Sequence, residues 1–171
     1  WNKNKILGFS LNDTLRLKWA IANITGKDYK KLDGYCIGEH GDGQVRLFEQ
    51  MKYDGEPIKI TEKQKIEATQ LTADWFKKYQ ELDSKRTTGW TSAVNIAKII
   101  EAIVTDSGVV IPCSTILTGE LGYDGLSMGM PVSLGKNGVK AIVLPELTAV
   151  QKKELDNTAS NIKDLINSII T

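Results

Sequence analysis

His40 is the single histidine of the chain, and it is preceded by Gly-Glu and followed by Gly-Asp, directly after the apolar residues 35–37. Histidine accepts and donates protons near neutral pH, because its unperturbed pKa is about 6.5. The flanking glycines permit a turn in which the backbone approaches a ligand closely. The residue types therefore indicate a group for general acid–base chemistry; the alternative is a solvated loop histidine without a chemical role.

Asp13 and Arg16 form a second polar pair upstream of the histidine. If this segment is helical, their spacing places both side chains on one face. An aspartate beside a histidine orients the ring and stabilises its protonated form, and an arginine holds a carboxylate at two points. The alternative is an ordinary surface ion pair, which would contribute about 0.2–0.5 kcal/mol to stability.

The apolar periodicity predicts the helices that must position these groups. They run from Leu11 to about Ile24, from Thr61 to about Leu82, from Thr91 to Thr105 and from Leu147 to Ile170. Ser10 or Asn12 could cap the first helix, and Thr148 the last. In the second helix we expect the aromatic residues Trp75 and Tyr79 to lie in the core or in a subunit contact rather than in a ligand site.

Short runs rich in β-branched residues, separated by glycines, predict the strands. They cover residues 35–37, 45–50, 51–53, 57–60, 109–117, 130–134 and 139–143, and Asp54-Gly55 is typical of a hairpin turn. Helices and hairpins follow one another without the regular alternation of a doubly wound sheet. The expected fold class is therefore α+β, with long helices packed on an antiparallel sheet and hairpins.

Composition and charge exclude several classes of protein. The length suits one domain over residues 1–171, and the net charge of +1 gives no indication of nucleic acid or of an anionic membrane as a partner. No apolar run approaches the roughly 20 residues that span a bilayer. Cys36 and Cys113 lie in apolar surroundings without a Cys-x-x-Cys pattern, so we expect reduced thiols in a cytoplasmic protein and no metal site.

Three strings of residues carry a resemblance to a known family. Asn-Asp-Thr-Leu-Arg at 12–16, Gly-Glu-His-Gly-Asp at 38–42 and Gly-Trp-Thr-Ser at 89–92 resemble, in this order, the substrate-domain motifs of the lactate/malate dehydrogenases. The likeness runs from about Lys5 to the C-terminus. No Gly-x-Gly-x-x-Gly follows a predicted strand. We therefore expect the C-terminal half of a longer dehydrogenase, whose nucleotide-binding half would bind most of an NAD or NADP cofactor.

The resemblance implies hydride transfer between NAD(H) and a small 2-hydroxy or 2-oxo acid, with malate slightly favoured over lactate. His40 would exchange the hydroxyl proton and contact the cofactor, Asp13 would orient it, and Arg16 would bind the substrate carboxylate. Thr91 would also bind substrate, since it follows a glycine at a helix N-terminus, where anions are favoured; its alternative role is to cap that helix. Asn95 would lie close to the nicotinamide ring, where the family usually has an apolar residue.

Other readings remain open. Because family members are dimers or tetramers, we expect a homo-oligomer in which this domain also contacts its own nucleotide-binding half. A rival from another class is an isolated, non-catalytic module that binds carboxylates or mediates oligomerisation. A third reading is a related NAD-dependent enzyme that acts on longer 2-hydroxy acids.

Overall fold

The computed structural model describes residues 2–83 and 89–170 of the chain. The helices are α1 (Leu11–Thr25), α2 (Glu62–Ala73), α3 (Trp75–Glu81), α4 (Gly89–Val104) and α5 (Ala149–Ile170), with short 3-10 turns at Lys3–Lys5, Tyr29–Lys31, Phe48–Gln50 and Glu120–Gly122. The strands are β1 (Gly8–Phe9), β2 (Leu32–Asp33), β3 (Cys36–Gly38), β4 (Gln44–Arg46), β5 (Lys52–Tyr53), β6 (Glu56–Pro57), β7 (Val110–Thr118), β8 (Asp124–Gly135) and β9 (Gly138–Ile142).

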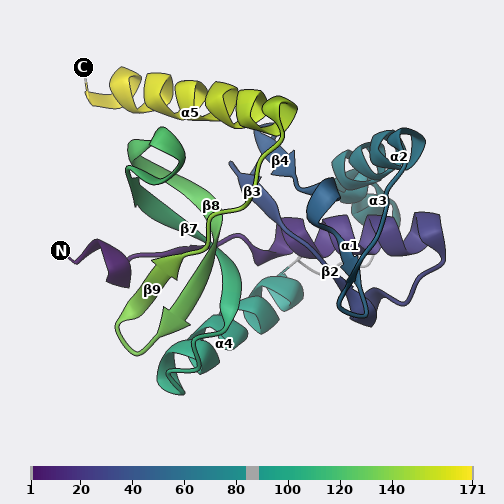
Figure 1. The fold of residues 1–171 in the computed structure, drawn as a ribbon, viewed down its shortest axis with the longest axis horizontal. Helices are drawn as coiled ribbons and strands as arrows, with labels where there is room; N and C mark the ends of the chain where they lie inside the picture. Colours follow the sequence, from purple (N-terminus) through teal and green to yellow (C-terminus); the bar gives the residue numbers. More distant parts are fainter. Residues whose placement is uncertain (1, 84–88, 171) are drawn as a thin grey trace.

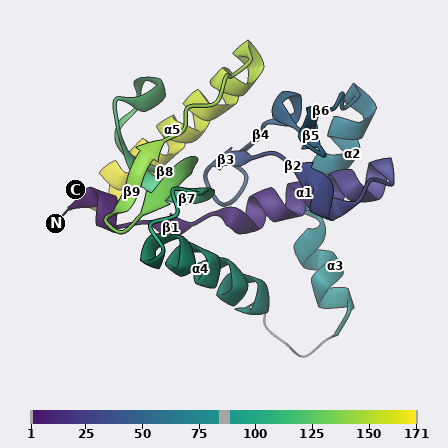
Figure 2. The ribbon, with the colours of Figure 1, turned by 60° about the horizontal axis from the view of Figure 1, so that its bottom comes forward.

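The strands form a larger and a smaller antiparallel sheet. In the larger sheet the order is β1-β7-β8-β3-β4, and β9 also pairs with β8; in the smaller it is β2-β5-β6. Helix α5 and helix α4 lie on opposite sides of the larger sheet, and α1 extends from this sheet to the smaller one (Figures 1 and 2). The predicted α+β class, with helices packed on an antiparallel sheet and hairpins, is confirmed.

Helix α1 contributes to both hydrophobic cores. Its first residue, Leu11, packs in the core between the larger sheet, α4 and α5, whereas Leu17, Ala20 and Ile21 pack in a second core with α2 and the smaller sheet. The helix ends at Gly26, whose left-handed conformation (φ 67°) allows its N–H to bond to the carbonyl of Ala22. One rigid element therefore connects the two cores and carries Asp13 and Arg16 between them.

Several local predictions are confirmed. The Asp54-Gly55 turn has positive φ at both residues (55° and 85°), as a tight hairpin requires. Thr148 caps α5, because its hydroxyl accepts the N–H of Gln151 while the Gln151 side chain accepts the N–H of Thr148. Ser10 stands at the start of α1, but its side chain forms no capping hydrogen bond.

Other predicted boundaries are wrong. The single helix predicted over 61–82 is interrupted at Asp74, which ends α2 and precedes α3. Leu71, Trp75 and Tyr79 keep a helical spacing across this break, so periodicity alone does not reveal it. The strand predicted over 45–50 ends at Arg46 and passes into a 3-10 turn, and β8 is longer than the predicted 130–134 because it pairs with β7 along most of its length.

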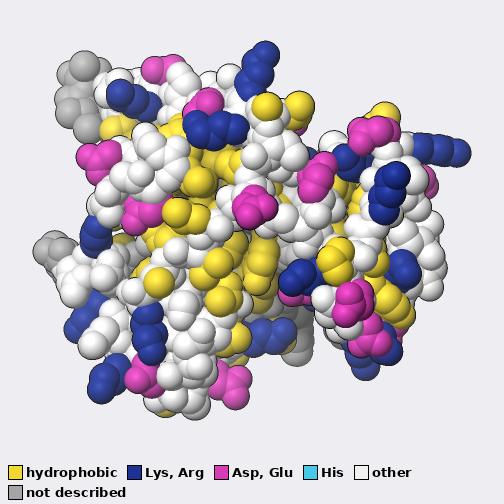
Figure 3. Space-filling view, viewed as in Figure 1, with side chains coloured by type: hydrophobic (Ala, Val, Ile, Leu, Met, Phe, Trp, Pro, Cys, Tyr) yellow, Lys and Arg dark blue, Asp and Glu magenta, His cyan; other side chains and the backbone are white. Residues whose placement is uncertain are grey.

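On the face seen in Figure 3, hydrophobic side chains gather near the centre, over the strands of the larger sheet, with charged side chains around them. Exposed apolar residues also occur on α4, where Val94, Ile100 and Val104 are more than half exposed. In the described part of the chain, no helix combines the length and apolar character that crossing a membrane requires.

Candidate active site

The turn between β3 and β4 raises His40 out of the sheet. Gly38 ends β3 with a left-handed φ of 91°, and a Cβ added there would lie 2.6 Å from the carbonyl oxygen of Gly43. The turn closes through a hydrogen bond from the N–H of Glu39 to the same oxygen. As a result the imidazole side chain is 68% exposed, and a ligand can reach it.

Asp13 holds the imidazole from behind. Its carboxylate is 4% exposed, and its Oδ2 lies 2.8 Å from Nδ1 of His40. The acid occupies the first turn of α1, where the helix dipole favours a negative charge. When Nδ1 donates to this carboxylate, Nε2 of the neutral ring is left as a proton acceptor, and no described residue forms a hydrogen bond with it.

Arg16 contacts the other oxygen of the same carboxylate. Its Nη1 lies 3.5 Å from Oδ1 of Asp13, and its side chain keeps 24% of its surface exposed. The guanidinium also lies over the Trp75 ring, 4.5 Å from the ring centroid, and Trp75 stacks on Tyr79 with 5.5 Å between centroids. Arg16 is therefore positioned from two sides by a buried charge and an aromatic face.

His40 and Arg16 line one cleft of about 540 Å³. The cleft lies between the His40 turn, β4 and α2, and the other residues that line it are Gly41, Asp42, Gln44, Arg46, Thr69, Thr72 and Ala73. A ligand in this cleft can therefore contact a proton acceptor and a guanidinium at the same time. The structure thus brings His40 together with Asp13 and Arg16 of α1, although the histidine lies on a separate segment of the sequence.

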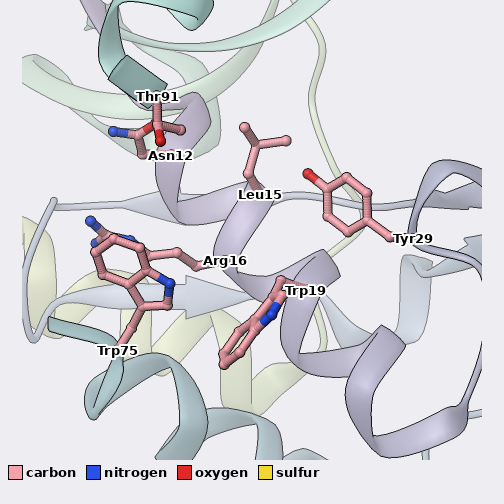
Figure 4. A pocket seen from close by; sticks show the side chains of 7 residues that line it. All are labelled: Asn12, Leu15, Arg16, Trp19, Tyr29, Trp75 and Thr91. Atoms are coloured by element: carbon pink, nitrogen blue, oxygen red, sulfur yellow. The ribbon is translucent and has the colours of Figure 1, made fainter. Parts of the chain in front are cut away.

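Arg16 also lines a second cavity, of about 300 Å³, on its other side. Figure 4 shows Thr91 and Asn12 at one end of this cavity, Tyr29 and Trp19 further along, and Trp75 across the Arg16 side chain; Leu15 completes the lining. Thr91 is exposed near the start of α4. Arg16 and Thr91, both predicted to bind substrate, therefore share a cavity that His40 does not line.

Asn95 has no exposed surface and lies on the side of α4 that faces α1. Its Nδ2 donates to Oδ1 of Asn12 at 2.5 Å, and Nδ2 of Asn12 donates to the hydroxyl of Ser92 at 3.4 Å. The Oδ1 of Asn95 has no hydrogen-bond partner among the described residues. Asn12, not Asn95, is the member of this pair that faces the cavity, so the predicted cofactor contact of Asn95 stays a prediction.

Trp75 and Arg46 belong to this region and were not predicted to do so. Of the two positions expected for Trp75, the core is wrong, because Trp75 lies outside both core clusters and lines the cavity beside Arg16; a subunit contact stays a prediction. No local pattern reveals this, since the break at Asp74 determines where α3 points. For Arg46 a signal exists: it alternates with Gln44 about Val45 on a strand that directly follows the histidine turn.

The two cysteines contribute no chemistry to the site. Both are free and buried, and burial raises the pKa of each thiol from the ordinary 9.0 to about 12. Cys36 packs in the core beside α2 and Cys113 in the core of the larger sheet. Within residues 2–83 and 89–170, no group of three His, Cys, Asp or Glu side chains could hold a metal ion.

Comparison with known proteins identifies the family of this chain. The family described as lactate/malate dehydrogenase, alpha/beta C-terminal domain, matches residues 11–171. A malate dehydrogenase of Haloferax volcanii is 29% identical over 170 residues, which cover 98% of this chain and 55% of that protein. An L-lactate dehydrogenase 2 of Lactococcus lactis is 30% identical over 175 residues. This match covers 98% of this chain and 56% of that protein.

Solved structures show the same relationship. The malate dehydrogenase of Salinibacter ruber superposes with a TM-score of 0.90 at 25% identity, and the lactate dehydrogenase of Cryptosporidium parvum, complexed with lactic acid and nicotinamide adenine dinucleotide, with 0.88 at 26%. Each match covers 99% of this chain and 56% of the other. The chain thus spans about half the length of the curated relatives it matches. It belongs to the lactate/malate dehydrogenase family and has the fold of that family's C-terminal domain.

Proposed function

We propose that residues 1–171 are the substrate-binding and catalytic domain of a longer dehydrogenase, which transfers a hydride between NAD(H), or NADP(H), and a small 2-hydroxy or 2-oxo acid. Malate is favoured over lactate. One observation carries the proposal: a buried carboxylate, Asp13, contacts the exposed His40 with one oxygen and Arg16 with the other. The relatives named malate and lactate dehydrogenases support the general class of reaction.

In this proposal His40 removes the hydroxyl proton of the 2-hydroxy acid at Nε2 and returns it in the reverse direction. Asp13 orients the ring and stabilises its protonated form; general acid–base help of this kind contributes about 10²–10⁴-fold to rate. The cofactor, when bound, supplies the hydride chemistry at carbon 2. The exposed imidazole of His40 leaves space for a second domain that would bring the cofactor and exclude water.

Arg16 grips the carboxylate at carbon 1 of the substrate. A guanidinium offers a planar fork of donors that matches a carboxylate at two points, which fixes the orientation of the adjacent reacting carbon. Trp75 on one side and Asp13 on the other limit the positions that this fork can take. Thr91 reaches the substrate from the cavity on the far side of Arg16.

The test uses the complete protein that carries this chain. NADH oxidation is followed with oxaloacetate and with pyruvate, and the wild type is compared with His40→Asn. Because the side chain of asparagine neither accepts nor donates a proton near neutral pH, kcat should fall at least about 100-fold. NADH binding, measured by fluorescence, should be retained because most cofactor contacts lie outside this domain. Near-normal turnover in the variant would contradict the proposed role of His40.

A second candidate is a carboxylate-binding or oligomerisation module without catalysis. The exposed apolar residues of α4 favour an assembly surface, which is equally compatible with an enzyme that forms a homodimer or homotetramer. Light scattering of the complete protein would measure its oligomeric state. Carboxylate binding without turnover of any 2-oxo acid would favour the module over the enzyme. Location in the cytoplasm is part of the same proposal, and the two free thiols support it.

A further inference from the structure

We propose that Thr158 of α5 is a positioning residue for His40, because its hydroxyl fixes the turn between β3 and β4 through the carbonyl of Gly43. The inference rests on the proposed function and deepens it, since it assigns the support of the histidine turn to a helix that carries none of the predicted site residues. Its starting point is that Oγ1 of Thr158 lies 2.9 Å from the carbonyl oxygen of Gly43, although the two residues are 115 positions apart in the sequence.

The carbonyl of Gly43 closes the histidine turn through two hydrogen bonds. It accepts the N–H of Glu39 at 3.3 Å and the hydroxyl of Thr158 at 2.9 Å. The bond within the turn is longer than the usual N–H···O range of about 2.7–3.2 Å. The bond from α5 therefore supplies the stronger support, and the turn depends on a residue outside it.

The hydroxyl of Thr158 is buried and has one proton to donate. The residue is 3% exposed, so water has little access to this hydroxyl. Its Oγ1 also lies 3.1 Å from the carbonyl oxygen of Glu154, one turn earlier in α5. That carbonyl already accepts an N–H within the helix, and the distance to Gly43 is the shorter one, so we assign the hydroxyl proton to the turn.

The turn lies directly against α5. A Cβ added to Gly43 would be 3.0 Å from both Oγ1 and Cγ2 of Thr158. A Cβ added to Gly38 would be 3.5 Å from Cδ1 of Leu155, which has no exposed surface, and 3.7 Å from Cγ2 of Thr158. Leu155 and Thr158 are three residues apart and share one face of the helix. Because this face contacts both ends of the turn, a change there shifts the backbone that carries His40.

The imidazole depends on this backbone for its place. It is 68% exposed, and its Nδ1 is held by Asp13 at 2.8 Å. Proton transfer requires close alignment, and a displacement of about 1 Å can lower a rate by about 100-fold. The described residues that line the cleft of His40 and Arg16 include none from α5. Thr158 therefore acts on the reaction through the position of His40, without contact to the substrate.

The experiment uses the complete protein and the variant Thr158→Val, which keeps the shape of the side chain and removes the hydroxyl. With oxaloacetate or pyruvate, kcat should fall by about 5- to 50-fold, because the turn loses its stronger hydrogen bond and His40 is misplaced. KM should change by less than about 3-fold, since Arg16 belongs to α1 and stays in place. Thr158→Ser keeps the hydroxyl and should restore kcat to within about 3-fold of the wild type. A rise of KM at unchanged kcat would overturn the inference.

Thr25→Val is the matched control. The hydroxyl of Thr25 donates to the carbonyl of Ile21 within α1, as the hydroxyl of Thr158 could donate within α5, but it does not support the turn. This variant should leave kcat and KM unchanged. A loss of kcat as large as that in Thr158→Val would overturn the inference, because it would then follow from removing any buried helical hydroxyl.

A double variant tests whether Thr158 acts through His40. When Thr158→Val is combined with His40→Asn, the residual kcat should fall by less than about 2-fold relative to His40→Asn alone, because the group to be positioned is already absent. A further loss as large as the one in the wild-type background would show that Thr158 acts independently of His40. That result would overturn the inference.

Amide hydrogen exchange separates this inference from the proposed function, because it requires no turnover. In Thr158→Val the amide of Glu39 should exchange at least about 5-fold faster, whereas that of Leu17 in the second core should not change. This result supports the role of Thr158 in the turn even if neither oxaloacetate nor pyruvate is reduced, an outcome that would reject the dehydrogenase alone. Unchanged exchange at Glu39, or equally faster exchange at both amides, rejects the inference even if the wild type is active.

Discussion

At the scale of single residues, Asp13 is the group on which the site depends. Its two oxygens have different partners, with 2.8 Å to Nδ1 of His40 and 3.5 Å to Nη1 of Arg16. The carboxylate is 4% exposed, so its loss of hydration must be offset by these partners and by the N-terminus of α1. One buried charge therefore positions both the proposed proton carrier and the proposed carboxylate clamp.

Asp13→Asn should lower kcat/KM in the complete protein by about 10²–10⁴-fold. The amide keeps the shape of the side chain but can present an N–H to Nδ1, which favours the wrong tautomer of His40, and it no longer stabilises the protonated ring. Steady-state kinetics across pH measure the effect. Glu67→Gln, at an exposed acid of α2, is the control and should behave as wild type. A loss of less than about 3-fold in Asp13→Asn would argue against the orienting role.

At the scale of elements, the site is assembled where α1, the β3–β4 turn and α2 meet. Helix α1 supplies Asp13 and Arg16, the turn supplies His40, and Arg46 and Thr72 come from β4 and α2. Gly38 of this turn tolerates substitution poorly, because an added side chain would meet the carbonyl oxygen of Gly43. The backbone conformation of one glycine thus decides where the imidazole lies.

Gly38→Ala should destabilise the protein and also reduce turnover, because the β3–β4 turn must shift. A non-glycine residue in such a region costs about 1–3 kcal/mol in unfolding free energy, and the clash adds to this. Gly26→Ala is a matched control: Gly26 also has positive φ, but nothing lies within 4 Å of an added Cβ and it is far along α1 from the site. Thermal unfolding and kcat are measured for both variants. A Gly38→Ala variant that is active and as stable as Gly26→Ala would contradict the proposed need for glycine in the β3–β4 turn.

At the scale of the whole molecule, two hydrophobic cores are joined through α1, and each buries one thiol. Burial raises the pKa of Cys36 and of Cys113 to about 12, whereas an unfolded chain has thiols near the ordinary 9.0. The folded state therefore keeps both protons at pH values where the unfolded state loses them. The resulting stabilisation is fully present below about pH 9 and is lost as the pH rises toward 12.

Chemical denaturation between pH 8 and 11.5 tests this dependence. The unfolding free energy of the wild type should fall more steeply above about pH 9 than that of a Cys36→Ala, Cys113→Ala double variant, because the variant has no thiols to ionise on unfolding. Identical slopes for the two proteins would contradict the assigned pKa shifts. Burial also raises the pKa values of Tyr29, Tyr35 and Tyr123. The comparison with the double variant separates the contribution of the thiols to the pH dependence from that of these tyrosines.

The sequence by itself determined the features that depend on neighbouring residues. The periodicity of apolar side chains predicted α1, α4 and α5, and the Asp54-Gly55 dipeptide predicted its hairpin. The proximity of Asp13 to Arg16 follows from helical spacing alone. Such features depend only on local backbone geometry, so they can be predicted from a single sequence.

The tertiary structure alone decided which distant segments meet. Asp13 and His40 lie 27 residues apart, and their contact exists because α1 packs beside β3. The contact of Trp75 with Arg16 depends on the break at Asp74, and the position of Arg46 depends on its hydrogen bond to Thr72 of α2. These contacts arise from the packing of two cores, which depends on many weak interactions over the whole chain. No short stretch of residues therefore predicts them.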